Sequence, residues 1–435
     1  MDLLRYRNKA FGALAVKSLP LLYGAAVILF VNTHLPRDTE LGVYTLAIAT
    51  FFVVSLMGKS FALYPLIKFL AEGRADRGIW KAGIYYWIGT QLIGAAVVWI
   101  IAPYTSIWFH AEGMADGMRW ACWIILVFIP RDLASALLVS RREVGRLFWL
   151  EACYFLVAAG GIVGFALAGI LHNADQVLGL NLAAGALSTA AAPLLCLGRI
   201  PKAETVGKQH WGTMARFGRD SLGIGIGDTV YTQLDYHLLG LFMGAGEVAL
   251  YFAAKNFFRF YNAVTQAINL LIFPTSSNLY ARGEIDKLKE LLEKILGSYL
   301  GLLLLVNTIL LFAADGIVAL VYRGIFPDAA NVLRIFILAS FFEPLYMVSE
   351  NVLYGIGKPK AILIAMWGSI PIFLLLAWLL MPRFGASGGA LAVAGTLVSL
   401  ASMTMYFIHK EIRVTPLSIV QRLVTVIPQL WARRR

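Results

Sequence analysis

The sequence is divided into about twelve apolar runs, each close to the length that a helix needs to cross a lipid bilayer. A hydrocarbon core about 30 Å thick requires about 20 helical residues. The 435-residue chain is 59% hydrophobic and 14% charged, whereas soluble domains are about 45–50% apolar and about 25% charged. We therefore expect an all-α integral membrane protein. The predicted spans are 12–31, 41–61, 82–102, 119–139, 150–171, 178–198, 220–242, 248–270, 296–314, 332–354, 361–381 and 386–408.

The distribution of Lys and Arg predicts the orientation of these spans, because basic residues in short connections are retained on the cytoplasmic side. If the first span enters from the inside, 28 of the 37 Lys and Arg residues fall in the two termini and in the connections after even-numbered spans. Five fall in the odd-numbered connections. We therefore expect both termini in the cytoplasm. The Lys and Arg residues that give the net charge of +12 are distributed between the apolar runs and are not gathered on one face. This distribution argues against a nucleic-acid partner.

The two halves of the chain align at a spacing of roughly 206 to 212 residues, with Tyr44 matching Tyr251 and Pro65 matching Pro274. Each half has six spans, an even number, so the halves should be related by an axis along the membrane normal. Transporters built in this way bind their substrate between the halves. The predicted parts are an N-lobe, a C-lobe and an interfacial basic tail, over residues 1–200, 201–410 and 411–435.

Helix-breaking residues fall at matching places in the two halves. Pro20 of the first span corresponds to Gly223, Gly225 and Gly227 of the seventh. Interrupted helices at matching places in two repeats are the best sequence indication of a binding site and hinge. The alternative, which the sequence leaves open, is that these glycines only permit close helix packing.

Ionisable residues inside the spans are functional candidates, because each costs at least about 2.5–3.5 kcal/mol on insertion scales. Lys255 and Arg259 lie one helical turn apart on the eighth span, and Asp235 and Asp228 lie at matching depths on the seventh. The i, i+4 spacing places Lys255 and Arg259 on one helix face. Two ion pairs, Asp235 with Lys255 and Asp228 with Arg259, are the structural alternative to a substrate-binding role.

Other candidates lie in the remaining spans. The further charged candidates are Arg131 and Asp132 of the fourth span, Glu343 and Glu350 of the tenth, and Lys59 and Lys17 near the cytoplasmic boundary. The last two have the alternative of extending to lipid headgroups. Most aromatic side chains of the seventh and eighth spans are expected to pack or to face lipid. Others, with Tyr231 and Tyr261 as candidates, would line a sugar-binding cavity.

Several motifs typical of enzymes are missing from the sequence. It contains no GxxxxGK[ST], HExxH, paired CxxC or GxSxG motif, so neither a built-in ATPase nor a metalloprotease or serine-hydrolase site is predicted. A membrane enzyme acting on sugars usually needs a large loop or a clustered acid and base, and the connections outside are short. We predict no catalytic residue, no metal and no cofactor, and a chain that moves its substrate across the bilayer.

Five segments carry a resemblance to a known family. They are ELGVYTLAIATF, GEVALYFAAKNFFRF, LYARGEIDKL, YGIGKPK and FGASGGALAVA, in this order along the chain. With the twelve spans, they make the chain resemble the Wzx-like polysaccharide flippases of the multidrug/oligosaccharidyl-lipid/polysaccharide exporter superfamily. The resemblance implies a MATE-like fold, with two six-helix lobes around a V-shaped central cavity that opens alternately to either side.

The resemblance also implies a substrate, an undecaprenyl-diphosphate-type glycolipid carried across the bacterial inner membrane. Such flippases tend to line the cavity with Lys and Arg, which here indicates Arg131, Lys255 and Arg259, with Lys17 and Lys59 near its cytoplasmic mouth. Arg side chains suit a diphosphate because they form charge-assisted, two-pronged hydrogen bonds. Further expected partners are anionic membrane lipids and the polysaccharide polymerase machinery, and the chain is expected to act as a monomer.

The energy source and the function class have alternatives. Coupling to H+ or Na+ is a hypothesis that rests on carboxylates at depth, namely Asp228, Asp235, Asp132, Glu343 and Glu350, because desolvation favours their protonation. A drug or metabolite antiporter of the same superfamily would take cations and rely on carboxylates. A membrane enzyme for lipid-linked sugars would form product, and a non-transporting scaffold would tolerate loss of Arg259.

Overall fold

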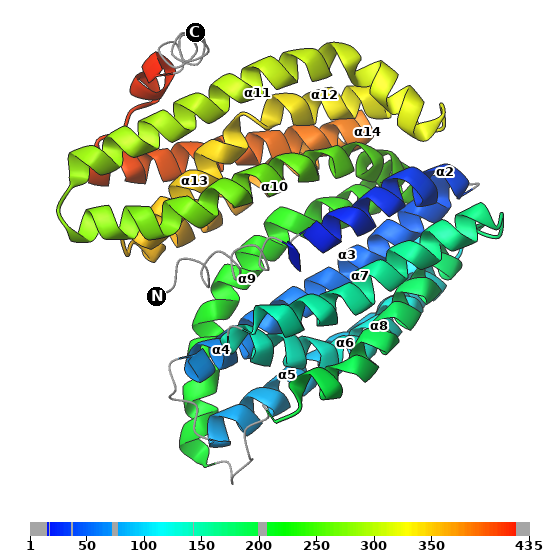
Figure 1. Ribbon diagram of the computed structural model, residues 1–435. Coiled ribbons are helices and arrows are strands. Elements are labelled where there is room, and N and C mark those ends of the chain that lie inside the picture. The colour runs from blue at the N-terminus through cyan, green and yellow to red at the C-terminus, as the bar shows by residue number, and fades with distance from the viewer. Residues whose placement is uncertain are drawn as a thin grey trace. The chain divides into compact units, whose positions relative to one another are not determined.

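The computed structural model describes residues 15–16, 18–35, 38–71, 77–141, 143–198 and 207–422. Over these ranges the chain folds into helices with no strand (Figure 1). The expected all-α membrane architecture is thereby confirmed. Two compact units, Met1–Ala249 and Leu250–Arg435, divide the chain, and each is described by itself below.

The first unit is a bundle of long helices with two π-helical turns. Its elements are η1 (Val27–Val31), α2 (Asn32–His34), α3 (Asp38–Gly58), η2 (Lys59–Leu63), α4 (Tyr64–Ala71), α5 (Arg77–Trp108), α6 (Met114–Ser140), α7 (Val144–Leu167), α8 (Ala174–Cys196) and α9 (Lys208–Met243). α3, η2 and α4 form one continuous apolar segment, Thr39–Leu70. A π turn inside an α-helix accommodates one extra residue and is frequent at functional sites.

Helix α9 packs against α3, η2, α4 and α5. Two of its glycines allow this close approach. A Cβ atom at Gly218 would lie 2.3 Å from the carbonyl oxygen of Phe61, and one at Gly225 would lie 2.1 Å from Oγ of Ser60. Both contacted residues belong to η2, so the glycine-rich part of α9 holds the π turn in place.

The second unit contains nearly all of α10 (Ala245–Ala281), together with α11 (Ile285–Tyr322), α12 (Ala329–Ala339), α13 (Phe342–Gly355) and α14 (Pro359–Ile412). α12 and α13 form one broken span with a bend of 42°. α14 reverses direction at Gly385, whose φ of 53° and ψ of −131° are not helical. Lys358, before α14, and Glu411, near its end, form a 2.9 Å ion pair, and this hydrogen bond and the carboxylate charge raise the pKa of the Lys358 ammonium.

The helices match the predicted spans. By length and hydropathy, seven described helices qualify as membrane spans, or eight with the α12–α13 pair. α14 contains the last two predicted spans, the shorter apolar helix Ser18–His34 corresponds to the first, and the charged α9 and α10 correspond to the seventh and eighth. The lobe boundary at residue 200 remains a prediction, and residues 423–435 of the predicted tail lie outside the described residues.

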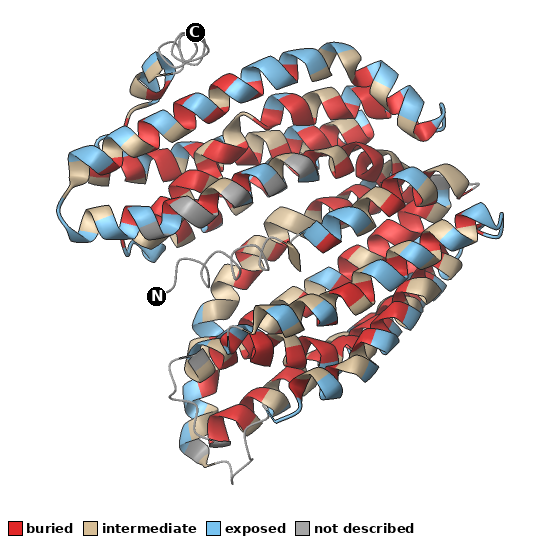
Figure 2. Ribbon diagram, viewed as in Figure 1, coloured by how far each residue is buried: buried red, intermediate tan, exposed pale blue. Residues whose placement is uncertain are grey.

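The outer surface of each unit carries large apolar side chains. Figure 2 shows exposed residues along the helices of both units, including α11. On α11, Phe312 is 85% exposed and Leu320 is 82% exposed. Apolar exposure of this extent on long helices is expected where the solvent is lipid.

Candidate functional site

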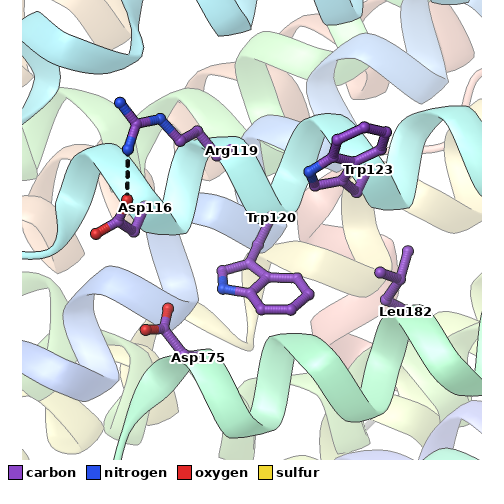
Figure 3. Close-up of a pocket in the computed structure, with 6 residues that line it drawn as sticks. All are labelled: Asp116, Arg119, Trp120, Trp123, Asp175 and Leu182. Carbon is purple, nitrogen blue, oxygen red and sulfur yellow. Dashed lines mark hydrogen bonds and ion pairs between the residues drawn. The ribbon is translucent and has the colours of Figure 1, made fainter.

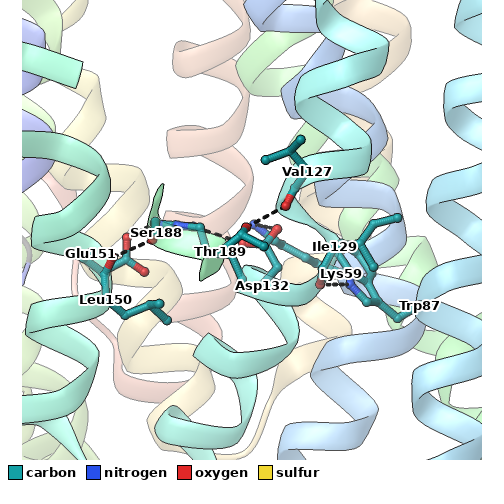
Figure 4. Close-up of polar contacts among 10 residues, drawn as sticks. Lys59, Trp87, Val127, Ile129, Asp132, Leu150, Glu151, Ser188 and Thr189 are labelled. Atoms are coloured by element: carbon teal, nitrogen blue, oxygen red, sulfur yellow. Dashed lines mark hydrogen bonds and ion pairs between the residues drawn. The ribbon is translucent and has the colours of Figure 1, made fainter. Parts of the chain in front are cut away.

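Four charged side chains from three elements meet inside the first unit. Lys59 is the first residue of η2, Arg131 and Asp132 follow Pro130 in α6, and Glu151 lies in the second turn of α7. Figure 4 shows the contacts around Asp132 and Glu151. We call Lys59, Arg131, Asp132 and Glu151 the charge network.

The charge network is continuous. Nζ of Lys59 lies 2.9 Å from Oδ2 of Asp132, and Nη1 of Arg131 lies 3.2 Å from Oδ1 of the same carboxylate. Nη2 of Arg131 is paired with Glu151. The Nε–H of Arg131 donates to Oγ of Ser188 at 3.2 Å. Two cations and two carboxylates therefore neutralise one another, as buried charges require.

Pro130 explains how the polar groups of α6 are arranged beside the network. Proline has no N–H to donate and disturbs the helical hydrogen bonds around it. Neighbouring helices supply donors to nearby carbonyls: Oγ1 of Thr189 donates to Val127 O at 2.7 Å, and Nε1 of Trp87 donates to Ile129 O at 2.9 Å (Figure 4). The segment that carries Arg131 is thus fixed on two sides.

Aromatic rings enclose the guanidinium of Arg131. Its Cζ lies 4.9 Å from the ring centroid of Phe128 and 5.1 Å from that of Tyr154. The hydroxyl of Tyr154 donates to Asn181 at 2.7 Å, which fixes the ring. Arg131 is therefore held by cation–π contacts as well as by its carboxylates.

The members of the charge network differ in accessibility. Arg131 is 5% exposed and Asp132 is 3% exposed, whereas 30% of the Lys59 side chain remains exposed. A ligand that reaches the network in this conformation meets Lys59 first.

The second unit places its two predicted cations on α10. Nζ of Lys255 lies 5.6 Å from the ring centroid of Tyr251, and Cζ of Arg259 lies 5.6 Å from that of Phe252. Lys255 is half-buried and Arg259 is exposed. Among the described residues of this unit, no carboxylate pairs with Arg259, in contrast to Arg131.

A polar cluster lies where α10, α11 and the α12–α13 bend meet. Tyr261 donates its hydroxyl hydrogen to Asn307 at 2.7 Å, and Asn307 donates to Oγ of Ser340 at 2.9 Å. Tyr261 and Tyr299 also line a largely apolar cavity of about 320 Å³. Tyr261, predicted to touch sugar, is thus placed in a structural hydrogen-bond chain beside a cavity.

Glu343 lies in the first turn of α13, directly after the bend. It is 1% exposed, and neither carboxylate oxygen has a hydrogen-bond partner among the described residues. One helical turn away, Met347 O accepts a hydrogen bond from Nδ2 of Asn269 at 3.4 Å, which joins α13 to α10. Glu350 is half-buried on the same helix.

The acidic candidates of α9 lie in the first unit. Asp235 is fully buried, with its Oδ1 accepting the backbone N–H of Tyr236 at 3.0 Å, and Asp228 is half-buried. His237, on the same helix, contacts Thr50 of α3 at 3.0 Å and the Gln233 carbonyl at 3.0 Å. No group of three or more metal-ligating side chains occurs among the described residues.

The remaining predicted positions are dispersed. Tyr231 is half-buried on α9, Pro20 is exposed, and Lys17 lies outside the described residues. Of the hinge glycines, Gly225 is in close packing with Ser60, whereas a Cβ atom at Gly223 would meet nothing within 4 Å. Whether these residues bind substrate or act as hinges remains a prediction.

Sequence reasoning missed Glu151 and Ser188. Glu151 is a single acid near the start of a long apolar run, and this lone charge was the available signal. Ser188 donates to Leu150 O at 2.8 Å and accepts from Arg131. Serines are common in membrane helices, so no sequence signal distinguishes it.

Comparison with known proteins supports the transporter assignment. A curated relative from Haloferax volcanii, named "Probable low-salt glycan biosynthesis flippase Agl15", is 23% identical over 296 residues, which is 67% of this chain and 61% of that protein. The chain thus spans less than two thirds of that relative.

Solved structures share the fold. A lipid II flippase, MurJ, in an inward closed conformation matches with a TM-score of 0.79 at 13% identity, covering 97% of this chain and 92% of that chain. An inward-facing multidrug resistance MATE transporter of the MOP superfamily matches with a TM-score of 0.72 at 12% identity, covering 92% and 98%. A MOP superfamily transporter from Pyrococcus furiosus matches at 0.59 and 11%, covering 91% and 93%.

These similar proteins are named as flippases and transporters, which agrees with the expectation of a transporter. The predicted resemblance is confirmed by a family model, which matches residues 83–324, more than half of the chain. The chain belongs to the polysaccharide biosynthesis protein family, and it is a multi-pass membrane protein whose fold is shared with the lipid II flippase and MATE transporter structures.

Proposed function

We propose that the chain translocates a glycan linked to a polyprenyl diphosphate from the inner to the outer leaflet of a bacterial inner membrane, by alternating access. The family match and the relative named as a glycan biosynthesis flippase support a lipid-linked glycan. The chain also shares its fold with a lipid II flippase, and this similarity is compatible with the proposed transport. The lipid tail stays in the bilayer, and the protein has to shelter the diphosphate and the sugars.

The observation that carries the proposal is the exposed guanidinium of Arg259 near the middle of α10. A charged side chain at bilayer depth is expensive and usually serves function. Arg259 has the Phe252 ring beside it, and no carboxylate among the described residues of its own unit is paired with it. Its planar fork therefore offers two parallel N–H donors to a diphosphate.

Lys59 provides the corresponding cation in the first unit. Its ammonium pairs with Asp132, yet part of the side chain is exposed. A diphosphate competes for this ammonium, while Arg131 remains to balance Asp132. The charge network thus supplies one exchangeable cation without leaving a buried carboxylate unpaired.

Glu343 is the candidate for coupling transport to an H+ or Na+ gradient. Its buried carboxyl group accepts either a proton or a cation, because no donor of the described residues neutralises it. It lies directly after the α12–α13 bend, and broken helices form the ion sites of many transporters. Binding of a proton or a cation to Glu343 would neutralise the carboxylate that is buried beside this bend.

An antiporter of organic cations shares the same fold but receives less support from the charges. An exposed Arg259 and a partly exposed Lys59 repel a cationic substrate. The fold does not separate the two functions, since flippase and multidrug transporter structures both match.

The test uses the purified full-length protein in liposomes that contain a polyprenyl-diphosphate oligosaccharide on one leaflet. We expect the glycan to become accessible to an external lectin, and Arg259→Ala to lose most of this transfer while still inserting. A polyprenyl monophosphate analogue should be moved more slowly. Transport of organic cations by the same liposomes, without glycan transfer, would overturn the proposal.

A further inference from the structure

A pocket of about 340 Å³ lies between α6 and α8 at the ends where both helices begin. Figure 3 shows the side chains that line it on the two facing helices. They are Asp116, Arg119, Trp120, Trp123, Asp175 and Leu182. The pocket lies wholly within the first unit and is separate from the charge network.

Helical spacing explains why these residues converge. On α6 the lining residues recur at intervals of three and four from Asp116 to Trp123, and on α8 Asp175 and Leu182 lie seven apart, so each set occupies one helix face. The indole of Trp120 packs over Gly179 of α8, where a Cβ atom would lie at a van der Waals distance of 3.6 Å from its Cη2. The result is a groove that is charged at its outer end and apolar further along the helices.

The charged end holds two carboxylates and one guanidinium. Arg119 and Asp116 form a 2.6 Å ion pair in which both side chains are about half exposed. The indole N–H of Trp120 is directed at Asp175 (Figure 3). Carboxylates in the first turn of a helix also interact favourably with the helix dipole. That stabilising role alone would not require a tryptophan beside Asp175. The charged end carries a net charge of about −1.

The apolar end is formed by Trp123 and Leu182. Trp123 is 51% exposed and contacts Trp99 edge-to-face, with ring centroids 6.1 Å apart. Tryptophan is enriched at the membrane–water interface, where its ring lies at the level of the headgroups. The groove therefore crosses from headgroup level into the acyl region, as a phospholipid does.

We propose that this groove binds a phospholipid whose headgroup carries a primary amine. The ammonium would donate to Asp175 and Asp116 and lie against the indole of Trp120, since carboxylates and aromatic faces both attract cations. The lipid phosphate would share the guanidinium of Arg119. The start of the acyl chain would follow Trp123 and Leu182.

The charge of the groove separates this lipid from other candidates. Two carboxylates repel the diphosphate of the transported glycolipid, so the groove is not part of the proposed route. An anionic phospholipid would meet the same repulsion. A quaternary ammonium headgroup keeps the cation–π contact but has no N–H to donate to Asp175.

Native mass spectrometry of the detergent-purified full-length protein tests the proposal, with phosphatidylethanolamine, phosphatidylcholine and phosphatidylglycerol added at equal concentrations. We expect phosphatidylethanolamine to be retained about tenfold more strongly than either alternative. Asp175→Asn and Trp120→Leu should each remove most of that preference. Elution as a single sharp peak in size exclusion shows that each variant is folded.

The matched control is Asp315→Asn in the second unit. Asp315 of α11 pairs with Arg334 of α12, so this site reproduces a partly exposed acid–arginine pair outside the groove. Its substitution should leave lipid retention unchanged. Equal retention of phosphatidylethanolamine and phosphatidylcholine, or full retention by folded Asp175→Asn, would overturn the proposal.

Discussion

Lys59 and Asp132 form a 2.9 Å ion pair between the π turn η2 and helix α6, in which the aspartate is buried and 30% of the lysine side chain is exposed. Asp132 also pairs with Arg131, and Arg131 in turn pairs with Glu151. The network is therefore graded from an accessible ammonium to an enclosed guanidinium. Only the accessible end is suited to exchange its partner with an anionic substrate.

This gradation predicts different costs for losing each cation. Arg131→Met leaves Asp132 and Glu151 without the guanidinium in the interior, and removing one partner of a buried pair costs about 3–5 kcal/mol of unfolding free energy. Lys59→Met should cost much less, because Arg131 still pairs with Asp132. Thermal unfolding in detergent measures both variants. Arg219→Met, in the exposed pair with Asp220, is the control. A loss of stability in Lys59→Met as large as that in Arg131→Met would contradict the assignment.

A second prediction compares two glycines of α9. Gly225→Ala places a methyl group on Ser60 and should destabilise by about 1–3 kcal/mol, as overpacking does. Gly223→Ala meets open space and should be neutral or stabilising by up to about 1 kcal/mol, because alanine favours helix. Unfolding temperatures of the two variants provide the comparison. Equal behaviour would mean that η2 and α9 separate easily, as the hinge hypothesis requires.

Glu343→Gln should retain or increase stability, since the carboxylate has no partner among the described residues and an amide avoids burying a charge. Transport by this variant should no longer respond to an imposed H+ or Na+ gradient. The measurement is initial transport rate in liposomes with and without each gradient. Glu290→Gln, in an exposed pair with Lys294, should keep the wild-type response, and an unaltered response of Glu343→Gln excludes this residue from coupling.

The fold was accessible from sequence because lipid imposes one simple rule. Each apolar run of about 20 residues becomes a helix, since backbone groups in hydrocarbon must be paired within the segment. The ends of the helices were harder to predict. Helix α9 begins at Lys208, whereas the predicted span begins at residue 220, because a helix can continue into water beyond its apolar part. Gly385 turns α14 back at the predicted connection between the last two spans.

The candidate site was accessible only in part. Lys59, Arg131 and Asp132 are conspicuous as charges within apolar runs. Their joining in one network depends on the π turn at η2, which is held by Gly225 of a distant helix, and no local pattern specifies such a turn. Glu151 joins the network because α7 packs beside α6, and this tertiary contact is likewise not specified by a local sequence pattern.

The predicted topology has its own test. A reporter that is active only in the periplasm should be silent when fused after Arg435 and active when fused after Ala245, because the basic connections are retained inside. Alkaline phosphatase activity in intact cells measures this, with protein level as the control. The opposite pattern at both sites would reverse the orientation and the direction of the proposed transport.

The last prediction concerns Arg259. If its guanidinium binds the diphosphate, Arg259→Lys should also be impaired, because a point charge does not reproduce a planar fork. Hydrogen bonds to charged groups contribute about 1.5–3 kcal/mol, so Arg259→Ala should lower transport by about ten- to a hundredfold. The measurement is lectin-accessible glycan in liposomes, normalised to inserted protein.

The competing role for Arg259 is to neutralise Asp228 of α9. In that case the single variant would leave an uncompensated charge and lower stability, and the double variant Arg259→Leu with Asp228→Leu would restore both stability and transport. If Arg259 binds substrate, the double variant should be stable and still inactive. Rescued transport in the double variant would therefore exclude the substrate-binding role, whereas a folded, inactive double variant supports it, since removal of Asp228 cannot replace the donors that the diphosphate has lost.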